Sequence, residues 1–513
     1  MTMLYKKQVR SLLGILAVSS LLLLNACQDH RLAPDPATVP DVTVYALNDA
    51  NQLLRFSVRT PGTTVPVSIS GTNQDERILA IDFRPATGQL YGVSNQSRMF
   101  VINPMTGAAR ALGMSAFSPA ISGTMVGLDF NPTVDRIRLV TNTGQDLRLN
   151  PETGGLAAID GAINGVSGAM ITEVAYTNNK AGATTTTLYD IDPATDRLYI
   201  QNPPNNGTLT DVGPLGLDIT GAAGFDISPT DNTQGLVAVT FNGASELQQI
   251  NLSTGRLQKL GNLPGTIIGL AIPTEPVAYA IEGTSNLLVF NPMSPTPVSK
   301  TIAGLQSGES LVGIDTRPLN GQLLALGSSS RLYSIAVTAT TSWSAVAVGS
   351  AGAFTLSGTD FGFDFNPTVD LIRVVSNTGQ NLRLNPNNGT LTATDGNLNP
   401  GTPNISAAAY TNNFVGTATT MLYDINIIPG SSAVLYTQNA NPGTLTMVGP
   451  LGVDAESANG FDIGGMSNTA YALLRVAGST KVYSINLASG TATAGATLPG
   501  NPTVRGFTLG LGF

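Results

Sequence analysis

Aspartates at matched positions are the residues of this sequence best suited to chemistry. They follow a small and an apolar residue in segments such as GLDFNP and GFDISP, most of which continue into a proline turn. Carboxylate oxygens are the ligands that hard cations such as calcium prefer, so aspartates brought together could form a cation site. The candidate metal ligands are Asp129, Asp364, Asp226 and Asp462.

A structural role explains the same aspartates, and we favour it over a cation site and over direct substrate chemistry. Asp and Asn near strand-to-strand turns accept backbone hydrogen bonds, and a buried Asp can pair with an Arg of a neighbouring sheet. The residues assigned to this role recur in both halves of the chain: Asp82 and Asp315, Asp135 and Asp370, Arg138 and Arg373, and Arg148 and Arg383.

Most other site chemistry is excluded by composition. The chain has one histidine, His30, and one cysteine, Cys27, and both lie near the N-terminus. Nucleophilic systems that need His or Cys, and zinc, copper or haem sites, therefore have no residues in the rest of the chain. No glycine-rich run between a strand and a helix suggests a phosphate-binding loop. Calcium is the one cofactor that we consider, and otherwise we expect none.

The elements that would position these aspartates belong to an internal duplication. The segment DFNPTVDRIRLVTNTGQDLRLNP of residues 129–151 returns as DFNPTVDLIRVVSNTGQNLRLNP at residues 364–386. Within each copy a shorter signature recurs every 44 to 52 residues, which is the length of a propeller blade. Short segments of alternating polarity, separated by Asn, Pro and Gly, predict four antiparallel strands in each period. We therefore predict an all-β chain, a β-propeller of ten four-stranded repeats.

Two ways of closing the propeller are open. Residues 42–272 and residues 273–513 could each close as a five-bladed propeller, with the strands near Ala271 and Thr508 completing the first sheet of each unit. Alternatively, only the termini close, and the chain forms one ten-bladed ring. A unit duplicated whole should fold alone, which favours two propellers. The short connection from Pro273 to Pro276 favours the single ring.

The N-terminus has the features of an export signal. Basic residues precede the apolar stretch LLGILAVSSLLLL, which is too short for a comfortable membrane span. The stretch ends in Leu24-Asn25-Ala26-Cys27, which resembles the lipobox of bacterial lipoproteins. That resemblance implies a signal peptide over residues 1–26, lipidation of Cys27 by acyl chains such as palmitate, and a flexible spacer over residues 27–41. It also implies a membrane-anchored protein of the bacterial cell envelope, either periplasmic or surface-exposed.

The repeated motif, followed in both copies by AYTNN and GFDI, resembles the bacterial family catalogued as domain of unknown function 4394. The resemblance covers about residues 42–272 and 275–513. It implies an exported propeller-like fold and supplies no catalytic residues.

A binding or scaffold module is the function that these features favour. We expect a lipid-anchored propeller that presents loops to an envelope or extracellular protein or glycan. A net charge of −8 argues against nucleic acid as a partner. The alternative is a carboxylate-dependent polysaccharide hydrolase or lyase, which needs an acid and a base. Glu152 and Glu173 have no acidic counterpart in the other half, and Trp343 is the single tryptophan, so we favour a protein that is not an enzyme.

Overall fold

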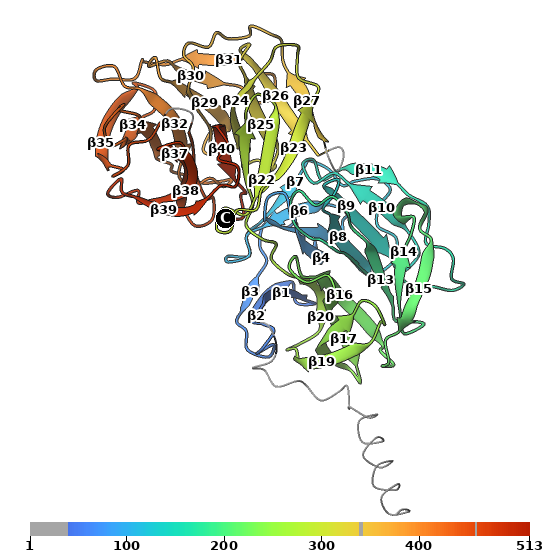
Figure 1. Ribbon diagram of the computed structural model, residues 1–513. Helices are drawn as coiled ribbons and strands as arrows, with labels where there is room; N and C mark the ends of the chain where they lie inside the picture. Colours follow the sequence, from blue (N-terminus) through green and yellow to red (C-terminus); the bar gives the residue numbers. More distant parts are fainter. Residues whose placement is uncertain (1–38, 40, 338–341, 457–458) are drawn as a thin grey trace, which may run out of the picture.

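A computed structural model describes residues 39, 41–337, 342–456 and 459–513. The signal sequence, Cys27 and His30 lie outside these residues. The described chain is all-β and its strands pair antiparallel with one exception, in sheets that are mostly four-stranded, as in propeller blades (Figure 1). One short 3-10 helix, η2 (Pro204–Asn206), lies between two strands. This architecture confirms the all-β, four-stranded pattern predicted from the sequence.

The first half contains sheets built from four consecutive strands and one sheet that is completed from a distance. The consecutive sheets are β4 (Ile78–Phe83), β5 (Leu90–Ser94), β6 (Met99–Ile102), β7 (Ala109–Leu112); β8 (Val126–Asn131), β9 (Arg136–Thr141), β10 (Asp146–Leu149), β11 (Leu156–Ile159); β12 (Glu173–Tyr176), β13 (Leu188–Asp192), β14 (Arg197–Gln201), β15 (Leu209–Pro214); and β16 (Gly221–Ile227), β17 (Gln234–Phe241), β18 (Ala244–Asn251), β19 (Leu257–Asn262). The completed sheet has the order β20 (Ile267–Ala271), β1 (Thr43–Asn48), β2 (Gln52–Ser57), β3 (Pro66–Ser68).

The second half repeats this arrangement. Its consecutive sets are β24 (Leu311–Thr316), β25 (Leu323–Gly327), β26 (Arg331–Ala336), β27 (Ser342–Val348); β28 (Phe361–Asn366), β29 (Leu371–Ser376), β30 (Asn381–Leu384), β31 (Leu391–Thr394); β32 (Ile405–Tyr410), β33 (Leu422–Asn426), β34 (Val434–Asn439), β35 (Thr444–Pro450); and β36 (Gly460–Ile463), β37 (Ala470–Val476), β38 (Ser479–Ile485), β39 (Ala492–Thr497). The completed set is β40 (Val504–Leu509), β21 (Ala278–Glu282), β22 (Asn286–Phe290), β23 (Val298–Ala303).

One pairing was not anticipated from the sequence. The outer strands β23 and β27 pair in parallel, with Ile302 opposite Trp343, and join two neighbouring sets into one eight-stranded sheet. Pairing of these edges removes the exposed backbone donors and acceptors that an outer strand otherwise presents.

The first strands of the sheets lie side by side. In the first half β4 contacts β8, β8 contacts β12, β12 contacts β16, β16 contacts β20, and β20 contacts β4. In the second half β24, β28, β32, β36 and β40 contact one another in the same cyclic way. Apolar side chains fill the space between adjacent sheets, as where Tyr91 of β5 meets Phe130 of β8 edge-on with ring centroids 5.1 Å apart.

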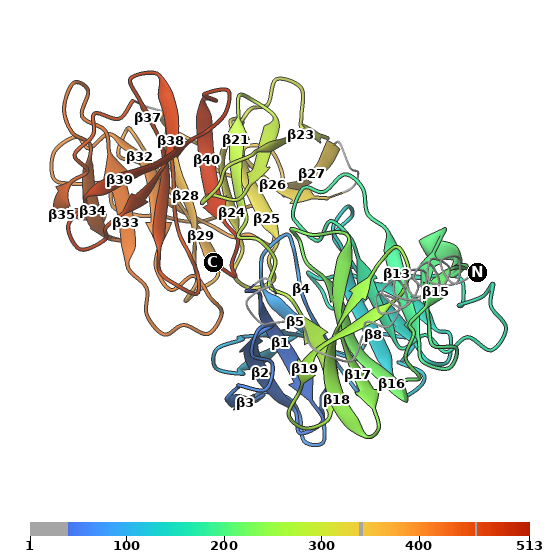
Figure 2. The same cartoon turned by 60° about the horizontal axis from the view of Figure 1, so that its bottom comes forward.

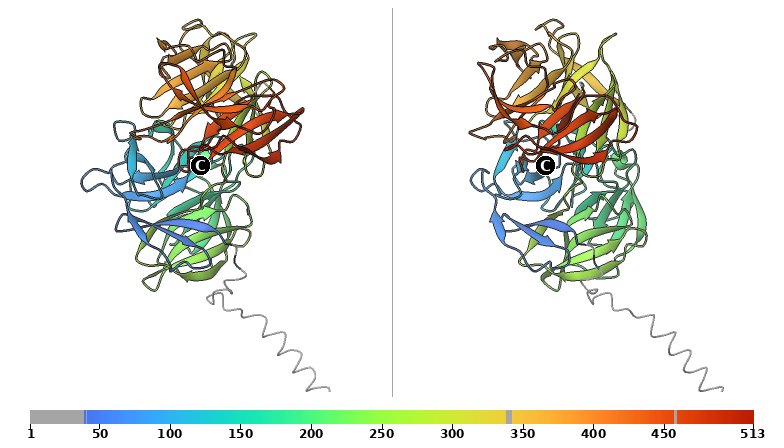
Figure 3. Two further views of the ribbon diagram at one scale, coloured as in Figure 1. Left: turned by 90° about the vertical axis from the view of Figure 1, so that its left-hand side faces the viewer. Right: turned by 60° about the vertical axis from the view of Figure 1, so that its left-hand side comes forward.

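The two halves meet where the chain passes from one to the other. Figure 2 shows the first half, blue to green, beside the second, yellow-green to red. The Tyr279 hydroxyl donates to the Ala86 carbonyl at 2.7 Å, and the Gly512 amide donates to the Thr87 carbonyl at 2.8 Å. The C-terminus therefore lies at this junction, as the views in Figure 3 also show.

Candidate functional site

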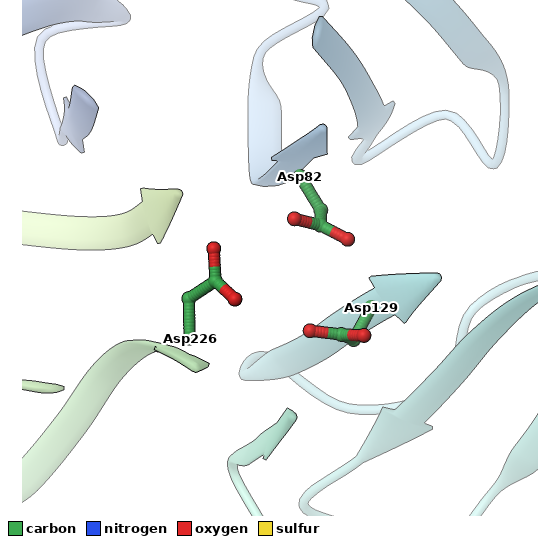
Figure 4. Close-up of side chains that lie close together, drawn as sticks. All are labelled: Asp82, Asp129 and Asp226. Atoms are coloured by element: carbon green, nitrogen blue, oxygen red, sulfur yellow. The ribbon is translucent and has the colours of Figure 1, made fainter. Parts of the chain in front are cut away.

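Three aspartates of the first half converge at its centre. Asp82 of β4, Asp129 of β8 and Asp226 of β16 each offer a carboxylate oxygen, and these oxygens lie within 4.8 Å of one another. Figure 4 shows the three side chains pointing toward a common point from separate strands. Each residue is at most 1% exposed. We call this cluster the first triad.

Two members of the first triad accept hydrogen bonds from backbone amides in, or directly after, the neighbouring first strand. The Phe130 amide donates to Asp82 Oδ2 at 2.9 Å, and the Ile272 amide donates to Asp226 Oδ2 at 2.6 Å. Each aspartate therefore links its own sheet to the next, which is the structural role considered for such residues in the sequence.

Asp129 differs from the other two members. Both of its carboxylate oxygens are buried and accept no hydrogen bond. The Tyr176 amide lies near enough to lower the pKa of Asp129 but does not reach hydrogen-bond geometry. Its counterpart in the second half, Asp364, does accept a hydrogen bond from the Tyr410 amide, at 3.1 Å. Asp129 is thus a carboxylate held among other carboxylates with its oxygens unsatisfied.

Burial and mutual repulsion favour the protonated forms of the first triad. Burial, reinforced by Asp226, raises the pKa of Asp82 well above its usual range. Burial also raises the pKa of Asp129 well above that range, with further contributions from Asp82 and Asp226. The pKa of Asp226 is raised to about 7, again chiefly by burial. No arginine or lysine in the described part of the chain offsets these effects, so an ionised cluster would require a cation, and without one the carboxyl groups hold protons.

The second half contains an equivalent cluster, the second triad, formed by Asp315, Asp364 and Asp462 within the same limit of 4.8 Å. Here a hydroxyl group enters the cluster. Thr508 Oγ1 lies 2.8 Å from Asp315 Oδ1 and 3.1 Å from Asp462 Oδ2. In the first half Ala271 holds the corresponding place, because Ala271 pairs with Tyr45 as Thr508 pairs with Tyr279. The first triad therefore lacks this donor.

The other matched residues form ion pairs between and within sheets. Arg84 Nε donates to Asp135 Oδ1 at 2.9 Å, and Arg317 Nε donates to Asp370 Oδ1 at 2.8 Å, each across two neighbouring sheets. Each contact links one sheet to the next.

Arg138 and Arg373 centre a second pair of networks. Arg138 Nη1 contacts Asp146 at 2.6 Å and Asp160 at 2.5 Å, and Asp160 also binds Arg148. In the second half, Asp395 binds both Arg373 and Arg383, while Asn381 replaces Asp146. The sequence interpretation overlooked Asp160 and Asp395, although their matched positions after LAAI and LTAT were a usable signal.

Further carboxylates are buried elsewhere. Burial raises the pKa of Glu173 well above its usual range, and the Gly224 and Phe225 amides partly offset this effect. Asp190 and Asp424 occupy matched positions, and both oxygens of each are buried without a hydrogen bond. Glu309 instead accepts hydrogen bonds from Ser329 and Tyr333, which lower its pKa. None of these groups forms an exposed acid and base pair with a triad.

A cleft lies at the junction of the halves and has a volume of about 730 Å³. Its lining is mainly apolar and comes from both halves, including residues 273–277 and the last four residues of the chain. Three large apolar side chains of its lining are exposed: Met105 at 58%, Phe414 at 43% and Met466 at 38%. The sequence interpretation did not identify this cleft, because its lining is spread over the whole chain.

The family model described as a domain of unknown function (DUF4394) matches residues 52–271 and 286–508. The chain belongs to this family. Among curated proteins, none matches this DUF4394 sequence. The family assignment suggested by the repeated motif is thereby confirmed, in two regions.

Two solved structures are similar to this DUF4394 chain. One is the extracellular domain of the putative hybrid two component system BT4673 from B. thetaiotaomicron, with 13% identity and a TM-score of 0.26 over 88% of this chain. This chain spans 65% of that domain. The other is PorZ, described as an essential bacterial surface component of the type-IX secretion system of Porphyromonas gingivalis, with 12% identity and a TM-score of 0.26. That match covers 90% of this chain and 69% of PorZ.

No helix within the described ranges has the length and apolar character needed to cross a membrane.

Proposed function

We propose that this DUF4394 chain is a lipid-anchored, extracytoplasmic binding module made of two five-bladed propellers. The proposed closure is supported by two pairings: β20 with β1 and β40 with β21. Each joins the last strand of one half to the first strand of the same half, as self-closing rings require. The chain boundary between the propellers then falls in residues 273–277.

The cleft between the halves is the proposed binding site, and its exposed apolar side chains are the observation that carries this assignment. A volume of about 730 Å³ suits a ligand site, since such pockets are usually ~300–1,000 Å³. Met105, Phe414 and Met466 remain exposed there although burial would be favourable. A partner that covers them gains apolar contact, and flexible methionine side chains adapt to its shape.

An extended peptide segment of an envelope protein is the proposed ligand. The apolar lining includes two methionines and four prolines, and the prolines are Pro104, Pro273, Pro276 and Pro318. Sugar sites rely more on paired polar groups, although the cleft also has aromatic side chains that a sugar could contact. A glycan is therefore the second candidate of the binding class.

The hydrolase alternative gains no support from the described carboxylates. Such an enzyme needs acidic side chains close together and not paired with arginine, and each triad brings three together in this way. However, their side chains are at most 1% exposed, and a sugar ring cannot reach them in this conformation. Of the other matched acids, Asp135 is held in an ion pair by Arg84, and Asp190 and Asp424 are 0% exposed.

Binding arrays with the full-length chain test this proposal. We expect the protein to bind peptides that tile envelope proteins, and expect Phe414→Ala and Met105→Ala to weaken binding at least tenfold. Met114→Ala is the control, because Met114 is fully exposed and lies outside the cleft lining. If the protein binds only printed glycans and the cleft variants lose that binding, the cleft remains the binding site and the ligand is a glycan. Binding that ignores all three substitutions would contradict the cleft assignment.

The anchor is tested separately at Cys27, which lies outside the described residues. We expect the wild-type protein to fractionate with membranes and to carry acyl groups by mass spectrometry. Cys27→Ser should release it into the aqueous phase, because the acyl chains provide the membrane affinity. Equal fractionation of both proteins would exclude a lipid anchor at this position.

A further inference from the structure

The first triad gathers three carboxyl groups that no described basic side chain pairs with. Asp82, Asp129 and Asp226 are fully buried, and none of them forms an ion pair with a described lysine or arginine. Three ionised carboxylates at this spacing repel one another strongly in a medium that screens poorly. A cation at their centre would remove this repulsion.

Two unpartnered polar groups point to a ligand independently of the clustering. Asp129 directs a carboxylate into the triad and accepts no hydrogen bond with either oxygen. Asn179, which is 0% exposed, lies beside the triad, with its Nδ2 donating to Asp226 Oδ1 at 3.4 Å. Its Oδ1 is buried without a partner. Buried groups of this kind normally have partners, so both need explanation.

The dimensions of the triad suit calcium. Calcium binds oxygen at about 2.3–2.6 Å, so oxygens on opposite sides of the ion lie about 4.6–5.2 Å apart. The triad oxygens all lie within 4.8 Å of one another, so none is too far from the others to bind the same calcium ion. A half-turn of the Asn179 amide would place its oxygen where the nitrogen now lies and would supply a fourth ligand. Magnesium, which binds oxygen at about 2.0–2.1 Å and requires stricter geometry, fits less well.

We propose that the first triad, Asp82, Asp129 and Asp226 with Asn179, is a binding site for one hard divalent cation of the size of calcium. The ion links β4, β8 and β16, which come from three different sheets, and so stabilises the centre of the first half. The site is separate from the proposed peptide cleft, and neither assignment depends on the other.

The second triad is a natural comparison for this site. Thr508 Oγ1 lies between Asp315 and Asp462, and its one proton can hydrogen-bond a carboxylate oxygen that an ion would otherwise bind. Asp364 accepts the Tyr410 amide, so it lacks the unsatisfied oxygens of Asp129. We therefore infer that the second triad binds the cation much more weakly than the first. The difference between the two sites lies chiefly in Ala271 against Thr508.

Isothermal titration calorimetry on the full-length, chelator-stripped chain in detergent tests this inference, with CaCl2 as the probe. We expect one calcium ion per chain for the wild type and none for Asp129→Asn. Asp364→Asn, the matched control in the second triad, should still bind one ion. Ala271→Ser adds a hydroxyl to the first triad and should weaken binding at least tenfold, whereas Thr508→Ala should add a second site.

Thermal unfolding provides a readout that does not depend on heats of binding. At calcium ~100-fold above the dissociation constant, mass action should raise the unfolding midpoint of the wild type by roughly 5–10 °C. Asp129→Asn removes a buried charge, so we expect it to fold and to show no calcium-dependent shift. Wild-type protein that binds no calcium at millimolar concentration would overturn the proposal. Equal binding by wild type and Asp129→Asn would also overturn it.

Discussion

Thr508 Oγ1 lies 2.8 Å from Asp315 Oδ1, although 193 positions separate the two residues. Thr508 belongs to β40, the last strand of the chain, and Asp315 belongs to β24, near the start of the second half. The hydroxyl therefore joins the two ends of one cyclic set of strands at its centre. Ala271, which holds the same place in the first half, cannot make this contact.

Replacing Thr508 should weaken the closure of the second half. Thr508→Ala removes a fully buried hydrogen-bond donor, so in the presence of chelator we expect the free energy of unfolding to fall by about 1–3 kcal/mol. Denaturant unfolding measures this loss. Thr497→Ala, at an exposed position of β39, is the control and should cost less than about 0.5 kcal/mol. Equal losses in the two variants would contradict the role assigned to Thr508.

Replacement of Arg84 should lower the free energy of unfolding more than replacement of Arg317. Arg84 and Asp135 have side chains 2% and 10% exposed, whereas Arg317 and Asp370 are 6% and 32% exposed. Arg84→Ala leaves Asp135 buried without its partner and should lower the free energy of unfolding by about 3–5 kcal/mol.

Arg317→Ala is the matched comparison for that change. Water can solvate Asp370 after the arginine is lost, so we expect a clearly smaller decrease in the free energy of unfolding. Denaturant unfolding of both variants under the same conditions gives the comparison. A cost at Arg317 as large as that at Arg84 would show that burial of the carboxylate does not determine the effect.

Asp146 should make the stability of the first half depend on pH. Burial raises its pKa to about 6, while Arg138 and Gln201 act in the opposite direction and Asp160 adds to the increase. Asp190 is the other titratable group that interacts with it. Because the folded state holds this proton more tightly than the unfolded state, the contribution to stability is full below about pH 4. It is lost as the pH rises through about 6.

The second half provides the substitution that tests this dependence, since Asn381 already stands in the place of Asp146 and accepts a hydrogen bond from Arg373. From pH 4 to pH 7, the free energy of unfolding of the wild type should fall by about 2–3 kcal/mol relative to that of Asp146→Asn, which has no carboxyl group to titrate at this position. Urea unfolding across this range measures the difference. Parallel pH profiles for the two proteins would show that Asp146 does not titrate differently on folding.

Gly224 should tolerate no side chain. Its φ is +95°, and a Cβ atom would lie 2.1 Å from the Leu270 amide nitrogen in the neighbouring strand β20. Gly224→Ala therefore combines backbone strain with a clash against backbone, and we expect a loss above about 3 kcal/mol. Gly243→Ala has a similar φ of +77° but open space around it, so it should cost only about 1–2 kcal/mol. Comparable midpoints in denaturant would mean that β16 and β20 can separate locally.

The strands were predictable because their signals are local. RIRLVT and DLRL alternate in polarity between turn residues, and they form β9 and β10 as expected. The exception is the parallel pairing of β23 with β27, because the edges that meet are determined by packing between sheets and not by polarity along either strand. The sequence also placed aspartates in the first strand of most repeats, where the structure has them.

The grouping of those aspartates was harder to predict. Asp82 was assigned to a structural role and Asp129 to a candidate metal site, yet both belong to the first triad. Their separation of 47 positions gives no measure of the distance between their oxygens. The involvement of Asn179 was likewise missed, because its position after a tyrosine strand resembles an ordinary turn.

The sequence alone determined the family, the duplication, the four-stranded periods and the residue types available for a site, since each depends on identity and spacing along the chain. Tertiary structure decided which carboxylates meet, which of them remain without a partner, and where the cleft lies. These features depend on closure, which brings β20 to β1 and β40 to β21. The hydroxyl of Thr508, which Ala271 lacks, affects the carboxylates only because closure places this position beside them. In that buried environment polar partners are few and charge is poorly screened.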